Sequence, residues 1–122
     1  MTIDHEFGRR FAERWAAAWN AHDLEAVLAH FAEDVEFSSP MIAVLTGRSE
    51  GTLHGRAALR EYWTEGLAKL PDLHFTVEDV RVGTDTVVVN YRNERGRQVA
   101  ELLTFGRDGL VVRGQGAYGP PA

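Results

Sequence analysis

The spacing of apolar residues changes once along this chain, from helical to strand-like. Helical spacing dominates the first seventy residues, and four strand-like segments follow at residues 73–82, 86–93, 98–105 and 110–118, separated by glycine-containing turns. Turns this short join antiparallel neighbours, so the four segments predict a meander. Helices that precede such a sheet have to cover one of its faces. The predicted class is therefore α+β.

Three helices are expected in the first part of the chain. Asp23 is a typical N-cap for the second, and the third follows Gly55 and ends before Pro71. The first helix, which ends near residues 20–22, is indicated by Phe7, Phe11, Trp15, Ala18 and Trp19, the second by Leu24, Val27, Leu28 and Phe31, and the third by Ala58, Leu59, Tyr62, Trp63, Gly66, Leu67 and Leu70. Val35 and Phe37 suggest a short strand that stops at residues 38–40, and residues 41–52, with two glycines, are expected to form an irregular loop.

Composition excludes several classes of function. A chain of 122 residues, 44% of them hydrophobic, is expected to form one soluble domain over residues 1–122. Its net charge of -5 and its scattered basic residues argue against nucleic-acid binding. Without cysteine, and with five histidines that lack metal-ligand spacing, no metal site or cofactor is expected. No apolar run approaches the roughly 20 residues of a membrane span, and a cytoplasmic location is the expectation.

One carboxylate is placed where a strand would bury it. In the segment 98–105, Glu101 shares a face with Val99, Leu103 and Phe105. A three-residue loop at 95–97 would pair it with Tyr91 and bring the apolar faces of two strands together. A slip of one residue would instead place Asn90 and Arg92 on its face. The first register is favoured because it buries more apolar surface.

The order of these motifs resembles the nuclear transport factor 2-like (NTF2-like) superfamily, and within it the SnoaL-like group and the related ketosteroid isomerases. The resemblance rests on Asn20-Ala21-His22-Asp23-Leu24-Glu25-Ala26-Val27, Phe31-Ala32-Glu33-Asp34-Val35, Leu53-His54-Gly55-Arg56-Ala57-Ala58-Leu59 and the closing strands. It implies a cone-shaped, strongly curved antiparallel sheet around N-terminal helices, with a deep apolar pocket. It also implies homodimers, but no particular activity.

Position by position, the resemblance implies that the isomerase catalytic set is mostly replaced. Its general base falls on Ser39, and its oxyanion-hole tyrosine falls on Trp15. The tyrosines that support it fall on Phe31 and Trp63, so the phenolic network is expected to be missing. Its second oxyanion-hole residue, a protonated aspartic acid, falls on Glu101. One carboxyl group of that machinery is therefore expected to remain.

The expected function is binding of a small, mostly apolar organic molecule, with Glu101 as its main polar contact and as the one candidate catalytic residue. The other expected ligand-binding residues are Trp15, Trp19, Ser39, Met41, Trp63, Tyr91, Leu103 and Tyr118. If the protein is an enzyme, cofactor-free isomerisation, cyclisation or dehydration is the expected chemistry. Alternatively Glu101 only satisfies Tyr91, an indole N–H or an arginine, and the protein is a noncatalytic binding or dimerisation module that pairs through Val88, Ala100, Leu102 and Thr104.

Two glycines in the last predicted strand have two interpretations. Gly114 and Gly116 alternate along the strand with Tyr118, so they could leave room on the face that the tyrosine shares. They could also mark a bulge or a bend that curves the sheet, and this second interpretation is favoured.

Overall fold

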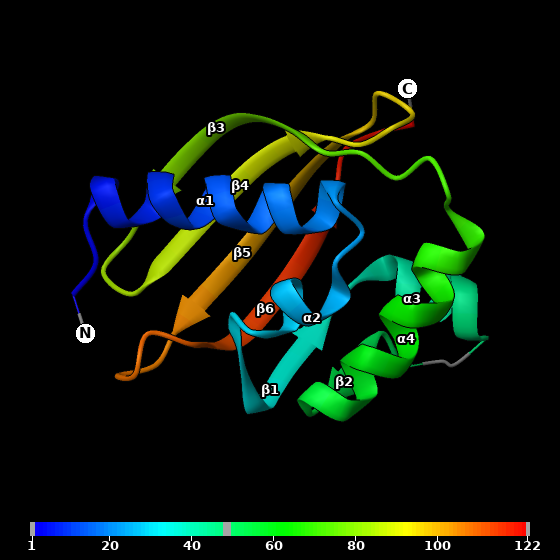
Figure 1. Ribbon diagram of the computed structural model, residues 1–122, viewed down its shortest axis with the longest axis horizontal. Coiled ribbons are helices and arrows are strands. Elements are labelled where there is room, and N and C mark those ends of the chain that lie inside the picture. The colour runs from blue at the N-terminus through cyan, green and yellow to red at the C-terminus, as the bar shows by residue number, and fades with distance from the viewer. Residues whose placement is uncertain (1, 48–49, 122) are drawn as a thin grey trace.

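The computed structural model describes residues 2–47 and 50–121 and has the predicted α+β fold (Figure 1). Its elements in chain order are α1 (His5–Asn20), α2 (Leu24–Leu28), β1 (Phe31–Ser38), α3 (Pro40–Thr46), β2 (Thr52–His54), α4 (Arg56–Lys69), β3 (Thr76–Val82), β4 (Thr86–Arg92), β5 (Gln98–Phe105) and β6 (Val111–Tyr118). The helices predicted at the start of the chain and the strands predicted after them are confirmed as elements.

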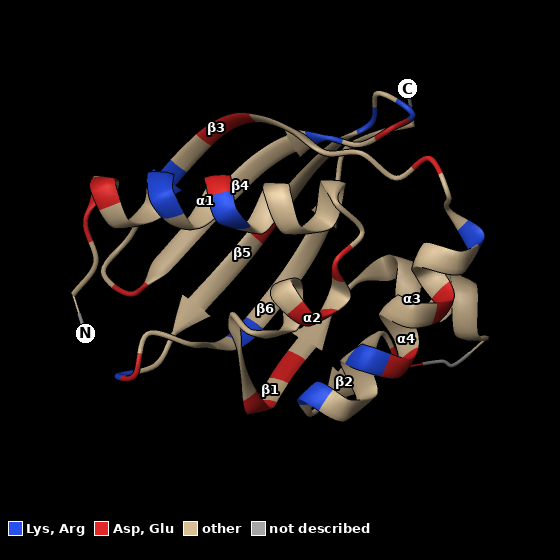
Figure 2. Ribbon diagram, in the orientation of Figure 1, with Lys and Arg blue, Asp and Glu red and all other residues tan. Residues whose placement is uncertain are grey.

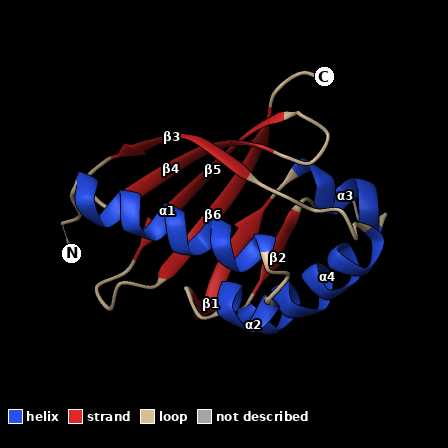
Figure 3. Ribbon diagram, turned by 45° about the horizontal axis from the view of Figure 1, so that its top comes forward, coloured by secondary structure: helices blue, strands red, loops and turns tan. Residues whose placement is uncertain are grey.

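The strands form one curved, open sheet of six strands in the order β2-β1-β6-β5-β4-β3 (Figure 3). β3 to β6 make the predicted antiparallel meander. The sequence analysis did not predict β2, which has three residues, or the parallel pairing of β1 with β6. Helix α4 carries the chain from β2 at one edge of the sheet to β3 at the other, and the meander then returns to place β6, the last strand, beside β1, the first.

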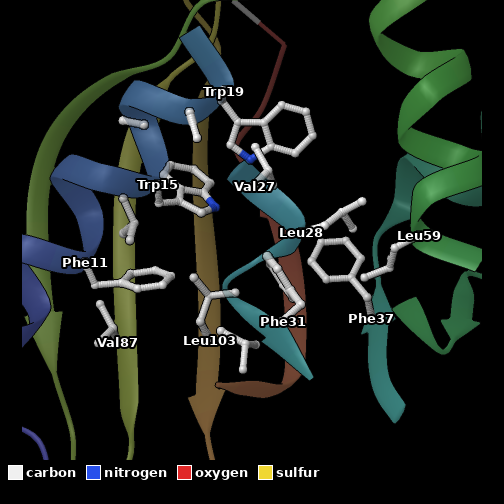
Figure 4. Packing of buried hydrophobic residues seen from close by; sticks show 14 of the residues in the cluster. Phe11, Trp15, Trp19, Val27, Leu28, Phe31, Phe37, Leu59, Val87 and Leu103 are labelled. Atoms are coloured by element: carbon white, nitrogen blue, oxygen red, sulfur yellow. The ribbon is translucent and has the colours of Figure 1, made fainter. Parts of the chain in front are cut away.

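Helices cover one face of the sheet and bury the core against it. α1 lies across the strands of the meander, and α2 and α4 lie over β1 (Figures 1 and 3). Figure 4 shows Phe11 and Trp15 of α1 above Val87 and Leu103, and a second group between β1 and α4. Phe31, Leu28 and Leu59 belong to this second group and are at most 2% exposed. Burial of these large side chains is the main force that holds the layers together.

Side-chain oxygens start three of the helices. Asp4 accepts from the backbone N–H of Phe7 at 2.9 Å, and Asp23 accepts from Ala26 at 3.1 Å, which confirms the predicted N-cap of α2. The loop predicted for residues 41–52 is wrong in its first half, where α3 forms. Ser39 caps α3, Pro40 is its first residue, and Gly47 ends it with φ +71°. Residues 48–49 of the predicted loop lie outside the described residues.

The predicted β4–β5 register is wrong by two residues, although the predicted face is right. Tyr91 pairs with Val99, and Glu101 pairs with Val89. The hairpin closes one residue earlier than predicted because Gly96 takes a left-handed φ of +76° at the end of the loop 94–96. The Asn93 side chain holds this loop by accepting from the N–H groups of Arg95 and Arg97 at 3.0 and 3.1 Å.

The strand predicted from Leu73 begins only at Thr76, because side chains from the end of α1 bind the backbone before it. Asn20 donates to the carbonyl of Phe75 at 2.9 Å and accepts from its N–H at 2.7 Å. His22 lies 2.9 Å from the carbonyl of Leu73. These bonds occupy the backbone groups that a neighbouring strand would need, and they fix the Phe75 ring above the sheet.

Candidate ligand-binding site

A cavity of about 570 Å³ lies between the concave face of the sheet and the helices α1, α3 and α4. This volume is typical of pockets that hold small organic molecules. All three tryptophans and all three tyrosines of the chain line it. Its wall is mostly aromatic and aliphatic, and Ser39 and Glu101 add polar side chains to it. Charged side chains line it at the β4–β5 turn and at the end of α4.

The aromatic wall is a connected set of rings. Phe75 is its centre: its ring centroid lies 4.4 Å from that of Tyr91, 5.4 Å from Trp15 and 5.7 Å from Trp19. Trp63 meets Trp19 edge to face at 5.1 Å. Edge and offset contacts of this kind add about 0.5–1.5 kcal/mol per pair beyond area burial, so the wall is held in shape by its own contacts.

Glu101 lies in this wall, on the inner face of β5. Its pairing partners Val89 and Gly116 flank it on the neighbouring strands. The residue is 8% exposed, and the hydroxyl of Tyr91 donates to its Oε1 atom at 3.1 Å. Within the described part of the chain Glu101 makes no ion pair. Of the contacts named in the structural alternative, the one with Tyr91 is present, and an ion pair with an arginine is absent among the described residues.

Burial makes Glu101 a weak acid. Loss of hydration raises the pKa of its carboxyl group to about 8, and the hydrogen bond from Tyr91, which favours the ionised form, only partly opposes this. With that pKa, about nine in ten molecules carry the proton at pH 7. Because Oε1 already accepts from Tyr91, the proton belongs on Oε2, where it can be donated to a ligand oxygen.

Three phenols surround the carboxyl group. Burial raises the pKa of Tyr62 to about 12, and the charges of Tyr118 and Glu101 act in the same direction. Burial and then Glu101 raise the pKa of Tyr118, while a side-chain hydrogen bond with Ser39 lowers it. Burial also raises the pKa of Tyr91. At neutral pH the site therefore presents neutral hydroxyl groups, which are hydrogen-bond donors and acceptors rather than charges.

The glycines of β6 make room, as the less favoured interpretation proposed. A Cβ atom on Gly114 would lie 2.7 Å from the Phe37 ring and 3.2 Å from Leu103, and one on Gly116 would lie 3.5 Å from both Oε1 of Glu101 and Oγ of Ser39. The irregularity in β5–β6 pairing lies between Arg113 and Val111 and not at the glycines. The pairing therefore shows no bulge at these two residues, and the suggestion that they bend the strand stays a prediction. Because Gly116 has no side chain, the space beside Oε1 of Glu101 and Oγ of Ser39 stays open.

Comparison with known proteins agrees with this geometry. A family model described as a SnoaL-like domain matches residues 12–114. The chain belongs to the SnoaL-like family. A SnoaL-like protein of unknown function from Burkholderia thailandensis is 40% identical over 98% of this chain and 99% of that one, with a TM-score of 0.93. No match was found among curated proteins.

More distant solved structures share the fold. An NTF2-like protein of unknown function from Cytophaga hutchinsonii is 16% identical, with 93% of this chain and 90% of that chain covered and a TM-score of 0.68. TerC, co-crystallized with polyporic acid, is 21% identical, with 93% and 92% covered and a TM-score of 0.75. The predicted membership of the SnoaL-like group is confirmed, and the fold is shared with an NTF2-like protein.

In this SnoaL-like domain all but one of the predicted site residues line the cavity. The exception is Leu103, which is fully buried in the core beside Gly114. The residues that do line it are Trp15, Trp19, Ser39, Met41, Trp63, Tyr91, Glu101 and Tyr118. Ser39, which the resemblance matches to the isomerase base, accepts at its Oγ from the N–H of Met41 at 3.2 Å as the cap of α3.

Sequence reasoning missed Tyr62, Phe75 and the charged side chains near the cavity. The phenols of the cavity stand at other positions than those matched to the isomerase tyrosines, which carry Trp15, Phe31 and Trp63. Tyr91 of β4 and Tyr118 of β6 were predicted to line the cavity, and α4 adds Tyr62. The sequence did hold a signal for Tyr62, because Gly66 lies one helical turn after it on the same face of α4. Both residues line the cavity.

The described residues contain no group of three or more histidine, cysteine, aspartate or glutamate side chains placed to hold a metal ion. They also contain no helix with both the length and the apolar character that crossing a bilayer requires.

Proposed function

We propose that this SnoaL-like protein binds a small, mostly apolar organic molecule in the cavity, with an oxygen atom of the ligand hydrogen-bonded to Glu101. The observation that carries the proposal is the burial of a carboxyl group in the wall of an aromatic cavity, with Tyr91 holding one of its oxygens. A structural carboxylate would be satisfied by closed contacts, whereas this one faces space for a ligand.

The wall determines the shape and polarity of the proposed ligand. Rings at the spacings of Phe75, Trp15 and Tyr91 offer flat apolar surface, which favours a flat and largely apolar body. The protonated carboxyl group donates one strong hydrogen bond, so a carbonyl or hydroxyl oxygen is the matching group. The co-crystal of TerC with polyporic acid, a protein of the same fold, supports small-molecule binding as a use of this architecture.

The test uses two probes that differ in one acceptor. All three tryptophans line the cavity, so a bound molecule should change the intrinsic fluorescence. We expect 2-acetylnaphthalene to bind about tenfold more tightly than 2-ethylnaphthalene. A buried hydrogen bond between neutral groups contributes roughly 1 kcal/mol, and 2-ethylnaphthalene would in addition leave the buried Glu101 donor without a partner. Glu101→Leu should remove this preference. Equal affinities of the wild type for the two probes would refute the role of Glu101.

A second candidate, catalysis, is favoured by the pKa of Glu101. At about 8 it makes both the acid and the carboxylate accessible near neutral pH, which is the condition for a general acid–base group. The proposed reaction class is proton transfer next to a carbonyl, as in cofactor-free isomerisation, cyclisation or dehydration. With serine at position 39, Glu101 would have to accept and return the proton itself.

Hydrogen exchange tests this candidate without knowledge of the substrate. A ketone with acidic α-hydrogens, such as 2-acetylnaphthalene, is incubated in D₂O and followed by proton NMR. Wild-type protein should exchange the methyl hydrogens faster than Glu101→Gln, because glutamine cannot accept a proton. Equal exchange by the two proteins would leave binding as the whole function of the site.

We also propose that the protein forms a homodimer through the outer face of the sheet. Leu102 of β5 and Val112 of β6 are 37% and 38% exposed, which is high for large apolar side chains on neighbouring strands. Leu102→Glu should produce monomers in multi-angle light scattering, whereas Val44→Glu, at an exposed position of α3, should leave the mass of the dimer unchanged. A wild-type protein of monomer mass would refute this proposal.

A further inference from the structure

Cationic side chains gather at one end of the cavity although the chain as a whole is acidic. Lys69, Arg95 and Arg97 all line the cavity, and we call these three residues the basic mouth. Among the described residues of the cavity lining, Glu94 is the one acidic residue besides Glu101. The whole chain carries a net charge of -5, so this local excess of positive charge runs against the overall balance.

The basic mouth is assembled from two distant parts of the sequence. Arg95 and Arg97 belong to the β4–β5 turn, and Lys69 is the last residue of α4. Figure 2 shows the basic segments of the turn close to the C-terminus and a separate basic segment at the end of α4, with the connection from α4 to β3 running between them. The turn is held by Asn93, which accepts from both arginine N–H groups, so its position is fixed before any ligand arrives.

Arg97 is oriented by its neighbours but keeps donors free. Its Nε donates to the carbonyl of Gly119 at 3.0 Å, and its guanidinium carbon lies 4.9 Å from the centre of the Tyr118 ring. A guanidinium has five N–H donors, and this contact uses one of them. The terminal N–H groups of a guanidinium form a planar fork that matches a carboxylate.

The cations of the protein fall into two groups by their pairing. Five arginines each lie within 4.0 Å of a carboxylate oxygen: Arg9, Arg60, Arg81, Arg92 and Arg113. Within residues 2–47 and 50–121, Lys69, Arg95 and Arg97 make no ion pair, and neither do Arg10, Arg14, Arg56 and Arg107. Of these unpaired cations, the three of the basic mouth are the ones that line the cavity. Cations without carboxylate partners that converge on a cavity are an arrangement suited to an anion.

We infer that the ligand is an organic acid, with its flat apolar body inside the cavity and its carboxylate at the basic mouth. This inference rests on the proposed function and adds the chemical class of the ligand to it. Placing the carboxylate at the mouth leaves it near water, where desolvation is small, and keeps it away from Glu101. Glu101, protonated at neutral pH, then meets a neutral oxygen on the ligand body.

The inference is tested with acid and amide pairs of the same shape. The probes are benzoate, 2-naphthoate and anthracene-2-carboxylate, each with its primary amide, and affinities are measured at pH 7 by tryptophan fluorescence and isothermal titration calorimetry. At about 20 mM ionic strength the best-fitting acid should bind about tenfold more tightly than its amide, because it forms charge-assisted hydrogen bonds. In 0.5 M NaCl this preference should shrink several-fold, because exposed charges are screened.

Variants identify the cations responsible. Arg95→Gln and Lys69→Gln change exposed side chains and should each weaken acid binding about two- to fivefold. Arg97→Gln should weaken it about tenfold, and none of the three should change amide binding by as much as twofold. Arg107→Gln is the matched control, because it removes the same charge from an exposed residue beyond the opposite end of β5 and should have no effect.

Failure of the inference can be distinguished from failure of the proposed function. If acid and amide bind equally, or if Arg107→Gln weakens acid binding as much as Arg97→Gln does, the anionic ligand is refuted while the proposed cavity function stands. If no probe of either kind binds, both the proposed function and the inference that rests on it are refuted.

Discussion

Replacing Glu101 with glutamine should remove a pH-dependent loss of stability from this protein. Glutamine keeps the shape of the side chain and an oxygen that accepts from Tyr91, but it has no charge to bury. The folded pKa of Glu101 is about 8, against an ordinary value of 4.5. The folded protein therefore binds a proton that the unfolded chain has already released at pH values between these two.

The sign and size of the effect follow from this difference in pKa. Because the folded state holds more protons in this window, stability from this group falls as the pH rises from about 4.5 to about 8 and is constant outside the window. At about 1.4 kcal/mol per pKa unit, the total loss is on the order of 4–5 kcal/mol, which is a large share of the stability of a small domain. Glu101→Gln should show no such loss.

Urea unfolding, followed by tryptophan fluorescence at each pH from 4.5 to 9, measures this directly. The difference in free energy of unfolding between Glu101→Gln and the wild type should grow in favour of the variant by about 1.4 kcal/mol for each unit that the pH rises within the window. His30, whose pKa is lowered first by burial and then by Arg14, contributes equally to both proteins, so it cancels in the difference. Glu65→Gln, on the exposed surface of α4, is the matched control and should keep the wild-type slope. Parallel curves for wild type and Glu101→Gln would refute the assignment of a neutral, buried carboxyl group.

Four other substitutions test three separate parts of the structure. Gly114→Ala should lower the free energy of unfolding by about 1–3 kcal/mol, because the new Cβ would lie 2.7 Å from an aromatic ring. Gly66→Ala adds a Cβ in open space within helix α4 and should raise the free energy of unfolding by about 0.5–1 kcal/mol. Urea unfolding measures both, and destabilisation by both substitutions would contradict the packing argument. Asn20→Ala should cost about 1–3 kcal/mol by leaving the two backbone groups it binds without a partner, and increased amide hydrogen exchange confined to residues 70–76 would locate the loss there, while unchanged exchange would contradict it. Tyr91→Phe should move the titration of Glu101 to higher pH, because the lost hydrogen bond favours the ionised form; a carboxyl-carbon NMR titration that shows a lower pKa would contradict this.

The elements that sequence predicted well are those with strong local signals. The apolar spacing of α1 and the N-cap of α2 depend on neighbouring residues, and both are confirmed. The face of Glu101 was also predictable, because alternation along a strand and the apolar set of its neighbour leave one arrangement that buries both. The resemblance to SnoaL-like proteins then placed this face inside a cavity.

The errors arose where two local signals compete or where a distant segment decides. The register of the β4–β5 hairpin depended on which residue of the turn takes the left-handed conformation, and only Gly96 does so. The start of β3 was missed because Asn20, fifty-five residues away from Phe75 in sequence, binds its backbone. The basic mouth was missed for the same reason, since its members meet only after α4 and the turn are folded.

Native mass spectrometry of the gently purified protein can show whether the cavity beside Glu101 holds a small organic molecule. We expect a complex with one molecule bound per chain, in which the bound mass is that of an organic acid and is lost in Glu101→Leu. A wild-type protein that carries no such molecule, and that also fails to retain any of the naphthalene or anthracene probes added before spraying, would contradict the account.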